Sequence, residues 1–413
     1  MEVGFYQFLT SCRSFGQDLK DVVKRRVVGG ASITGCTLEA ALGRPMHGAW
    51  APTSLKHAPF DLAAISFNTP GAPMAYSAAK HLKASGKTVV AGGPHPSVLP
   101  NEALKYFDAV CIGPGDVQFH RMAADAEHGQ LKPIYRGGPG DWVIPRRRQS
   151  RGLSIVQSSR GCRRSCRFCV VPSLFPGPID EKPMELIEAE LSTTSDSITI
   201  IDDNFPLNGD RGKQMLSLLR DLGKSFYCQV SAESASDAKS LKILAEAGCT
   251  LVGVGIESIS QKSRSFLGKP PITDPAGIIG RIHDAGMGSY INLVFGSDGE
   301  TFDIFEKTMQ FIEKARPTIV SPHILTPFPG TKIYDYFETS NRLLFETKSS
   351  VDAWSLFDCR HIVIAPNPMT PEELGAGFST FMKEVFSLRS TVRRARRGSF
   401  GAALLSSLLN NEW

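Results

Sequence analysis

Three cysteines stand close together in a polar stretch of the sequence and could bind a metal centre. Cys162, Cys166 and Cys169 follow the spacing C-x-x-x-C-x-x-C, and the next cysteine and histidine along the chain are Cys228 and His283. A zinc knuckle would need a fourth ligand within roughly a dozen residues, and the sequence offers none there. A [4Fe-4S] cluster is normally held by four cysteines, so three cysteines leave one iron without a protein ligand. Metal sites that keep such an open coordination position are usually the catalytic ones, because another molecule can bind there. The spacing therefore predicts a reactive [4Fe-4S] cluster, with three buried structural cysteines as the alternative.

The cysteine run, with the aromatic residue Phe168 before its last cysteine, resembles the radical S-adenosylmethionine superfamily. The resemblance implies that the amine and carboxylate of S-adenosylmethionine chelate the open iron. It also implies that an electron from the reduced cluster splits the sulfonium to give a 5′-deoxyadenosyl radical. In such an enzyme the protein supplies orientation, exclusion of water and the choice of substrate.

The bulk composition is that of a globular protein with two domains. The chain has 413 residues, of which 42% are hydrophobic and 21% charged, and this is close to average usage for a soluble protein. The opening residues Met1–Tyr6 have neither a basic region nor a long apolar one, and no stretch approaches the ~18 apolar residues that span a bilayer. Three of the nine cysteines are clustered and the others are scattered, unlike a disulfide framework. We expect a cytoplasmic protein without a membrane span.

Arginines are concentrated beside the cysteine run. Eight arginines and no acidic residue lie between Arg146 and Arg167, although the net charge of the chain is only +5. Such a belt could steer an anionic small-molecule substrate, or the acidic surface of a reductase such as flavodoxin or ferredoxin. A solvated linker face is the alternative. The sequence contains no RNA-binding module, so no nucleic-acid partner is expected.

Residues 1–140 alternate short apolar runs with amphipathic stretches, which predicts an α/β fold with a Rossmann-like doubly wound parallel sheet. The expected strands are Val3–Phe8, Leu62–Phe67, Thr88–Ala91 and Ala109–Ile112. A helix is expected over Ala75–Ser85, ended by Gly86. Glycine-rich turns follow the last two strands, and ligands of such sheets lie outside the carboxyl ends of the strands.

These turns resemble those of the cobalamin-binding Rossmann-like domain that precedes many radical S-adenosylmethionine domains. The resemblance implies that Gly92, Gly93, His95, Gly113 and Gly115 border a cobalamin. The Asp-x-His-x-x-Gly signature, in which histidine replaces the lower base of cobalamin, is absent from the sequence. Many radical relatives lack this signature as well. The alternatives are a turn histidine that caps backbone groups and glycines that serve tight turns only.

A polar linker over residues 141–151 is followed by six further strand–helix units in residues 152–335. The expected strands are Leu153–Gln157, Ser197–Ile201, Phe226–Val230, Thr250–Ile256, Ser289–Phe295 and Thr318–His323. Six such units in one parallel sheet predict a (β/α)6 partial TIM barrel, which is also the fold that the resemblance implies. The cysteine run follows the first of these strands, so the cluster is expected at the mouth of the barrel.

Polar residues follow the other strands, at the end of the barrel where reactive groups sit. The resemblance implies that Asp202, Asp203 or Asn204 lies near the methionine amine of S-adenosylmethionine, and that Glu257 and Ser258 lie near its ribose or amine. The alternative for one of the two aspartates is that it caps the next helix.

The remaining candidates for this ligand come from neighbouring segments. The resemblance implies that Phe168 and the strand from Ile291 to Gly296 face the adenine, and Ser231 is a further candidate at the tip of the third strand. For Glu300, at the tip of the fifth strand, the alternative is a place in the first turn of its own helix. No residue is assigned a catalytic role.

Residues 336–413 are expected to form a helical extension with a basic tail. Thr370 and Glu373 form a capping box with a proline at the first helical position, and this predicts a helix that reaches Ser387 and packs its apolar face on the rest of the protein. The basic run Arg393–Arg397 is predicted to be a solvated helix end rather than a site for nucleic acid or lipid.

Three functions are compatible with these features. The first is a cobalamin-dependent radical methyltransferase that acts on an unactivated carbon, or on phosphorus, of a small molecule. The second is a radical oxidoreductase, rearrangement enzyme or ring-forming enzyme without cobalamin, suggested by the missing histidine signature. The third is an iron–sulfur sensor without turnover, and the carboxylates expected around the barrel mouth argue against it.

Overall fold

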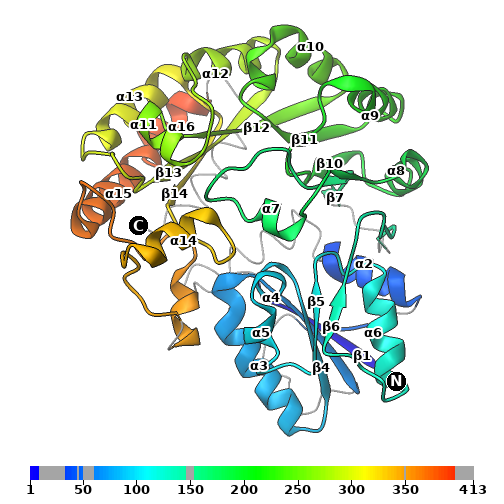
Figure 1. Cartoon of the computed structure of the whole chain (residues 1–413). Coiled ribbons are helices and arrows are strands. Elements are labelled where there is room, and N and C mark those ends of the chain that lie inside the picture. The colour runs from blue at the N-terminus through cyan, green and yellow to red at the C-terminus, as the bar shows by residue number, and fades with distance from the viewer. Residues whose placement is uncertain (9–32, 44–45, 50–59, 146–152, 348–349, 396–413) are drawn as a thin grey trace.

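The computed structural model describes residues 1–413 except 9–32, 44–45, 50–59, 146–152, 348–349 and 396–413. Over the described residues the chain forms two six-stranded parallel sheets, one after the other along the sequence (Figure 1). The α/β fold class predicted from the alternating apolar runs is confirmed.

The N-terminal sheet has the strand order β2-β1-β3-β4-β5-β6. Its strands are β1 (Val3–Phe8), β2 (His47–Ala49), β3 (Leu62–Phe67), β4 (Thr88–Gly92), β5 (Ala109–Ile112) and β6 (Ile134–Arg136). Every residue of β3 is buried, as expected of a central strand covered on both faces. The two strands that sequence analysis missed, β2 and β6, have only three residues each. The strand order reverses between β1 and β3, and ligands of doubly wound sheets bind at such a switch point.

Helices cover both faces of this sheet. They are α2 (Ile33–Leu42), α3 (Ala72–Ala84), α4 (Pro94–Val98), α5 (Pro100–Ala103) and α6 (Gln118–Glu127). Figure 1 shows α3 and α5 on one face and α2 and α6 on the other. The helix predicted over Ala75–Ser85 is α3, which begins earlier because a proline occupies its first turn. Gly86 follows with φ 76°, the left-handed conformation expected of a glycine after a helix.

The second sheet has the order β14-β13-β12-β11-β10-β7, so its strands are adjacent in chain order, as in a partial barrel. The strands are β7 (Ser154–Val156), β10 (Ser197–Ile200), β11 (Ser225–Val230), β12 (Cys249–Glu257), β13 (Gly288–Phe295) and β14 (Ile319–Ile324). All six predicted strands are present. A short antiparallel ladder joins β8 (Ser159–Arg160) to β9 (Asp180–Glu181) beside them.

The barrel helices lie along the outside of this curved sheet (Figure 1). They are α8 (Met184–Leu191), α9 (Gly209–Asp221), α10 (Ala238–Glu246), α11 (Gln261–Phe266), α12 (Pro275–Asp284) and α13 (Ile304–Ala315). Burial alternates along β11: Phe226, Cys228 and Val230 are buried in the core beneath the helices, whereas Tyr227 and Gln229 are only half-buried. Side chains of a strand alternate between its two faces, so Tyr227 and Gln229 face the barrel interior.

The C-terminal extension packs on the barrel, as predicted. It contains α14 (Lys332–Thr339), the 3₁₀ helix η4 (Val351–Leu356), α15 (Pro371–Val385) and α16 (Leu388–Ala395). The predicted capping box is present, since Glu373 N donates to Thr370 Oγ1 at 3.1 Å and Thr370 N donates to Glu373 Oε2 at 2.9 Å. On α15, the ring of Phe381 lies 4.8 Å from the ring of Phe295, which ends β13. This apolar face therefore belongs to the core.

The extension also reaches the N-terminal sheet. Trp354 of η4 is buried, and its indole nitrogen donates to Glu102 Oε1 of α5 at 3.1 Å. The turn after β14 is held to α7 (Val171–Leu174) of the barrel, because Ser173 Oγ donates to Gly330 O at 2.5 Å. A Cβ atom on Gly330 would lie 3.0 Å from Val98 of α4, so this turn packs closely on the N-terminal domain.

The basic run at the end of the described chain differs from its prediction. Arg393 forms an exposed ion pair with Glu313, but Arg394 is buried and donates to Val385 O at 2.9 Å. The prediction of a solvated helix end is therefore wrong for Arg394. Arg396 and Arg397 lie outside the described residues. Among the helices of the described ranges, none combines the length and the apolar content that crossing a bilayer requires.

Candidate functional site

The three predicted cluster ligands line one cavity at the carboxyl end of the barrel strands. Cys162, Cys166 and Cys169 all border this space of about 250 Å³, which we call the cluster cavity. The loop that carries them follows β8, turns at Gly161 with φ 92°, and is closed by a hydrogen bond from Cys169 N to Cys166 O at 3.2 Å. The thiols thus converge on a shared space rather than on a hydrophobic core.

The donor set fits an iron–sulfur cube. All three cysteines are free thiols. Within the described residues, no three His, Cys, Asp or Glu side chains are placed to hold a single metal ion. A cube sets a different requirement, because each thiolate binds its own iron and the sulfur atoms surround the cluster. Burial raises the pKa of Cys169 to about 11 and also raises the pKa of Cys166, so these thiols ionise as they bind metal.

Two aspartates after β10 hold the cysteine loop in place. Asp202 is 3% exposed and accepts four hydrogen bonds from Ser158 and Ser159, through their backbone nitrogens at 2.7 and 3.1 Å and their hydroxyls at 2.5 and 2.9 Å. Asp203 accepts from Gly161 N at 2.9 Å. Burial raises the pKa of both carboxyls. The alternative that one of them caps the next helix is wrong, because Asn208 occupies that position.

Glu257, at the tip of β12, has a strained backbone and a charged partner. Its φ is 59°, which is uncommon for a residue other than glycine and is a conformation that occurs often at functional sites. Its carboxylate lies 2.9 Å from the ammonium of Lys269, and both side chains are largely buried. The pair lies over Gly255, where a Cβ atom would be 2.4 Å from Glu257 Oε1. Lys269 Nζ is also 5.9 Å from the ring centre of Phe168, so one charged pair joins the cluster loop to β12.

The structure brings together most of the predicted ligands of S-adenosylmethionine, whose roles remain predictions. Those that line the cluster cavity with the cysteines are Phe168, Asp202, Asp203, Asn204, Ser231 and Glu257. Four charged residues in this lining were not among the predicted ligands of S-adenosylmethionine: Arg164, Glu233, Arg264 and Lys269. Arg164 belongs to the arginine belt inside the cysteine run, whereas the other three belong to no motif and follow strands of the barrel.

Three predicted residues do not line this cavity. Ser258 is buried and donates to Glu300 at 3.2 Å, while Ile291 is buried in the core under the helices. Gly296 faces the extension, where a Cβ atom would lie 2.9 Å from Leu374. Glu300 accepts from Gly296 N at 2.8 Å and precedes α13, which begins at Ile304. The alternative of a place in the first turn of that helix is therefore wrong.

The described part of the arginine belt offers few free charges to a substrate. Arg160 pairs with Asp116 at 2.8 Å and Arg164 pairs with Glu233 at 2.6 Å. Arg167 donates to a backbone carbonyl at 3.1 Å and stacks on aromatic rings. The belt members before residue 152 lie outside the described residues. Among the described members, Arg163 is the exposed one.

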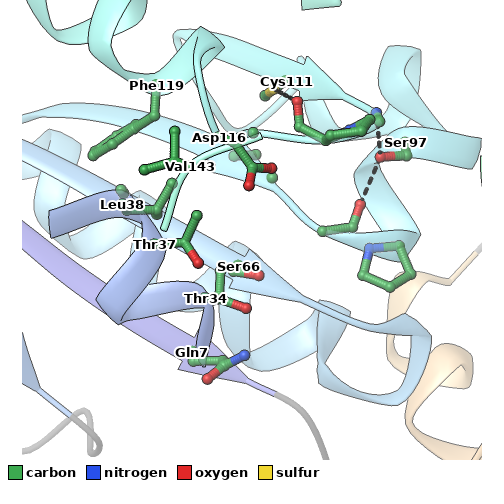
Figure 2. Close-up of a pocket in the computed structure, with 18 of the residues that line it drawn as sticks. Gln7, Thr34, Thr37, Leu38, Ser66, Ser97, Cys111, Asp116, Phe119 and Val143 are labelled. Atoms are coloured by element: carbon green, nitrogen blue, oxygen red, sulfur yellow. Dashed lines mark hydrogen bonds between the residues drawn. The ribbon is translucent and has the colours of Figure 1, made fainter. Parts of the chain in front are cut away.

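A second cavity, of about 430 Å³, lies at the carboxyl ends of the N-terminal strands and is called the N-terminal cavity. Figure 2 shows Gln7 of β1, Ser66 of β3 and Phe119 of α6 around it, with Thr34 of α2. Its lining is mainly apolar. The predicted residues that line it are Gly92, Gly93, Gly113 and Gly115. At Gly93, with φ 100°, a Cβ atom would lie 2.8 Å from a backbone oxygen of β3, so only glycine fits the close approach of this turn.

The predicted residue His95 does not line the N-terminal cavity. Its ring is buried against α3 and α5, with ring nitrogens 3.1 Å from both Tyr76 Oη and Glu102 Oε1 and 3.2 Å from Thr69 Oγ1. Its partners are side chains, so the alternative of a histidine that caps backbone groups is wrong as well. His95 therefore stabilises the packing of the N-terminal domain, and its partner Glu102 also binds Trp354 of the extension.

One short helix separates the two cavities. In α7 (Val171–Leu174), Val171 lines the cluster cavity, whereas Leu174 and the following Phe175 line the N-terminal cavity. The helix comes directly after the cysteine loop. Guests in the two cavities would therefore lie on opposite sides of one turn of helix.

Comparisons with known proteins assign this arrangement to a class. Residues 156–312 match the model of the radical SAM superfamily. The chain is 25% identical over 342 residues to bacteriochlorophyllide d C-8(2)-methyltransferase of Chlorobaculum tepidum, covering 76% of this chain and 74% of that protein. It is 23% identical over 359 residues to the C-12(1)-methyltransferase of the same organism, covering 81% and 76%.

Solved structures resemble the whole fold. The methyltransferase TsrM of Kitasatospora setae, with cobalamin and a [4Fe-4S] cluster bound, superposes with a TM-score of 0.68 at 15% identity, over 95% of this chain and 90% of that one. The radical enzyme OxsB, with aqua-cobalamin and S-adenosylmethionine bound, superposes with a TM-score of 0.67 at 12% identity, over 95% of this chain and 68% of that one. Residues 156–312 therefore carry a radical SAM domain. Such a domain holds a [4Fe-4S] cluster and S-adenosylmethionine.

Proposed function

We propose that this protein is a cobalamin-dependent radical SAM methyltransferase that acts on an unactivated carbon, or on phosphorus, of a small molecule. The observation that carries the proposal is the pair of cavities on opposite sides of α7. One cavity is lined by the three cysteines, and the other by the glycine turns of the N-terminal sheet. The two bacteriochlorophyllide relatives are both methyltransferases, which supports the same reaction class.

The cluster cavity has the groups that a radical SAM reaction needs. With its cofactors bound, the site would use the cluster and S-adenosylmethionine as the source of a 5′-deoxyadenosyl radical and cobalamin as the source of the methyl group. The three cysteines hold the cluster, and Asp202 fixes the loop that presents them. Glu257 places a carboxylate in the cavity wall, suited to the amine or ribose of S-adenosylmethionine, and its ion pair with Lys269 fixes its position.

The N-terminal cavity fits a corrinoid in position and chemistry. It lies at the switch point of a doubly wound sheet, where such folds bind their ligands. Its apolar walls are combined with a few polar groups, among them Gln7 and Ser66 at strand ends and Ser97 of α4. None of the described residues that line it is a histidine. We propose that cobalamin binds here without an imidazole ligand to cobalt from these residues.

The cysteines also bear on the cellular compartment of the protein and on its source of electrons. Cys162, Cys166, Cys169, Cys228 and Cys249 of the barrel are all free thiols. We propose that the protein works in the reducing cytoplasm and receives electrons from a reductase such as flavodoxin or ferredoxin. The substrate is proposed to be a small molecule, and the described arginines give no particular support to an anionic one, because Arg160 and Arg164 are already paired.

The proposal is tested with protein that is purified and reconstituted without oxygen. We expect iron and sulfide in the ratio of one [4Fe-4S] cluster per chain, formation of 5′-deoxyadenosine from S-adenosylmethionine after reduction, and retention of hydroxocobalamin through gel filtration. Cys166→Ala is expected to lose the cluster, whereas Cys228→Ala, a matched change at a fully buried thiol of the barrel core, is expected to keep it.

Each alternative function predicts a different result. A cluster whose spectrum does not respond to S-adenosylmethionine, with no 5′-deoxyadenosine formed, would reject the radical function and favour an iron–sulfur sensor. Formation of 5′-deoxyadenosine without retention of hydroxocobalamin would reject the methyltransferase assignment and favour a cobalamin-independent oxidoreductase, rearrangement or ring-forming enzyme.

A further inference from the structure

Arg160 lines the N-terminal cavity and lies in the chain just before the cluster loop. It ends β8, is 6% exposed, and is followed by Gly161 and then by the first cluster ligand. All three of its guanidinium nitrogens are used. They donate to Asp116 Oδ1 at 2.8 Å, to Asp141 O at 3.1 Å and to Gln157 Oε1 at 3.3 Å. These partners belong to the N-terminal domain, the linker and the barrel, so one side chain joins three parts of the molecule.

An aromatic residue of the linker completes the contact. The guanidinium carbon of Arg160 lies 3.7 Å from the ring centre of Trp142, and the ammonium of Lys182 lies 4.9 Å from the same ring. The indole nitrogen of Trp142 donates to Asp180 Oδ1 at 3.1 Å. A planar guanidinium can stack and form directed hydrogen bonds at the same time, which lysine cannot. The arrangement therefore fixes orientation as well as distance.

The Arg160–Asp116 pair is poorly explained as a source of stability. Its side chains are 7% and 9% exposed, and taking two charges out of water costs about as much as their attraction returns. A buried ion pair of this kind is better suited to specifying one arrangement of the groups around it. Both residues line the N-terminal cavity, while the backbone of Arg160 continues into the cysteine loop.

We propose that Arg160 is a positioning residue that sets the place of the N-terminal cavity, and of the corrinoid bound in it, relative to the cluster loop. The inference rests on the proposed function for the identity of the guest, but the contact between the domains exists without the guest. Asp116 is its partner on the N-terminal side. The two cofactors are thereby held at one distance from each other.

The first experiment needs no corrinoid. Hydrogen–deuterium exchange is measured on the full chain with its cluster, for the wild type, Arg160→Gln and Arg160→Lys. We expect Arg160→Gln to raise hydrogen–deuterium exchange in residues 113–118 and 137–142, with unchanged iron content. Arg160→Lys is expected to give a smaller rise, because lysine keeps the positive charge but loses the directed hydrogen bonds of the guanidinium and its stacking on Trp142. Unchanged exchange in both segments, or a rise spread evenly over both sheets, would overturn the proposal.

The second experiment measures the geometry with cofactors bound. Pulsed electron paramagnetic resonance on protein holding cob(II)alamin and the reduced cluster gives the distance between the two spins. We expect one narrow distance in the wild type, a broadened or displaced one in Arg160→Gln, and hydroxocobalamin affinity about tenfold lower in Asp116→Asn, because breaking a buried pair leaves an uncompensated charge. The same narrow distance in Arg160→Gln would overturn the proposal.

A matched control separates positioning from general loosening. Asp298 and Arg342 form another largely buried aspartate–arginine pair, at 2.6 Å, but it joins the barrel to the extension. Asp298→Asn is expected to leave the distance between the spins unchanged, and a shift as large as that of Arg160→Gln would count against the proposal. A wild type that keeps its cluster but takes up no hydroxocobalamin would reject the proposed function, and the exchange experiment would still decide the role of Arg160.

Discussion

The buried carboxylate of Asp202 offers the sharpest test of how the cluster loop is held. In Asp202→Ala, two backbone amides and two hydroxyls of Ser158 and Ser159 lose their acceptor. The hydroxyls can rotate toward other acceptors, but the two amides belong to the backbone that joins β7 to β8 and cannot turn away. Each buried amide left without a partner costs about 1–3 kcal/mol. Removing the buried carboxylate returns part of this cost, so the free energy of unfolding should fall by about 3 kcal/mol.

Urea unfolding of the anaerobic protein, followed by tryptophan fluorescence, measures this loss. With a slope of about 3 kcal/mol/M, the midpoint should fall by about 1 M. Asp202→Asn keeps one acceptor oxygen and should lose about 1 kcal/mol. We expect iron content to fall in the same order, because the loop that presents the thiols follows directly from Ser159.

The control for this series is Asp210→Ala, at a side chain that is 91% exposed in the first turn of α9. A surface change of this kind should alter the free energy of unfolding by at most about 0.5 kcal/mol. If Asp202→Ala unfolded at the wild-type urea concentration and kept its full iron content, the reasoning that Asp202 organises the loop would be refuted.

Two further predictions concern the end of the N-terminal domain and the barrel. At Gly137 a Cβ atom would lie 1.8 Å from a backbone oxygen, whereas at Gly138 it would meet nothing within 4 Å. Gly137→Ala should therefore lower the melting temperature of the protein, and Gly138→Ala should leave it unchanged. Equal melting temperatures of the two variants would contradict this prediction. Burial, and secondly the charge of Arg360, lowers the pKa of His323 to about 4. The unfolded chain then binds the proton more readily, so stability should fall between pH 7 and pH 4, by about 2 kcal/mol at pH 5. His323→Gln should flatten that part of the curve of unfolding free energy against pH, and an unchanged curve would argue against the assignment.

The sequence was sufficient for the features that depend on local pattern. Cysteine spacing located the loop that borders the cluster cavity, and the repeated apolar runs predicted all six barrel strands. The capping box at Thr370 was also predictable, since it depends on residues three apart in the chain. The strands β2 and β6 could not be predicted because a run of three residues carries too little periodicity.

The residues whose positions were predicted wrongly are those whose side-chain direction is not encoded in the local sequence. The segment from Ile291 to Phe295 is almost wholly apolar, so its pattern does not tell which face points into the barrel, and Ile291 points outward. His95 sits in a glycine-rich turn, but α4 directs its ring toward Tyr76 and Glu102. Lys269 was missed because its partner Glu257 is brought near by a tertiary contact that no local spacing records.

The single turn of helix between the two cavities has a thermodynamic consequence. Val171 and Leu174 belong to the same turn of helix, so a guest that displaces one of them is expected to move the wall of the other cavity as well. Binding in the two cavities is then linked, and linkage is reciprocal: the factor by which S-adenosylmethionine changes the affinity for a corrinoid equals the factor by which the corrinoid changes the affinity for S-adenosylmethionine. α7 can therefore make the loading of one site depend on the occupancy of the other.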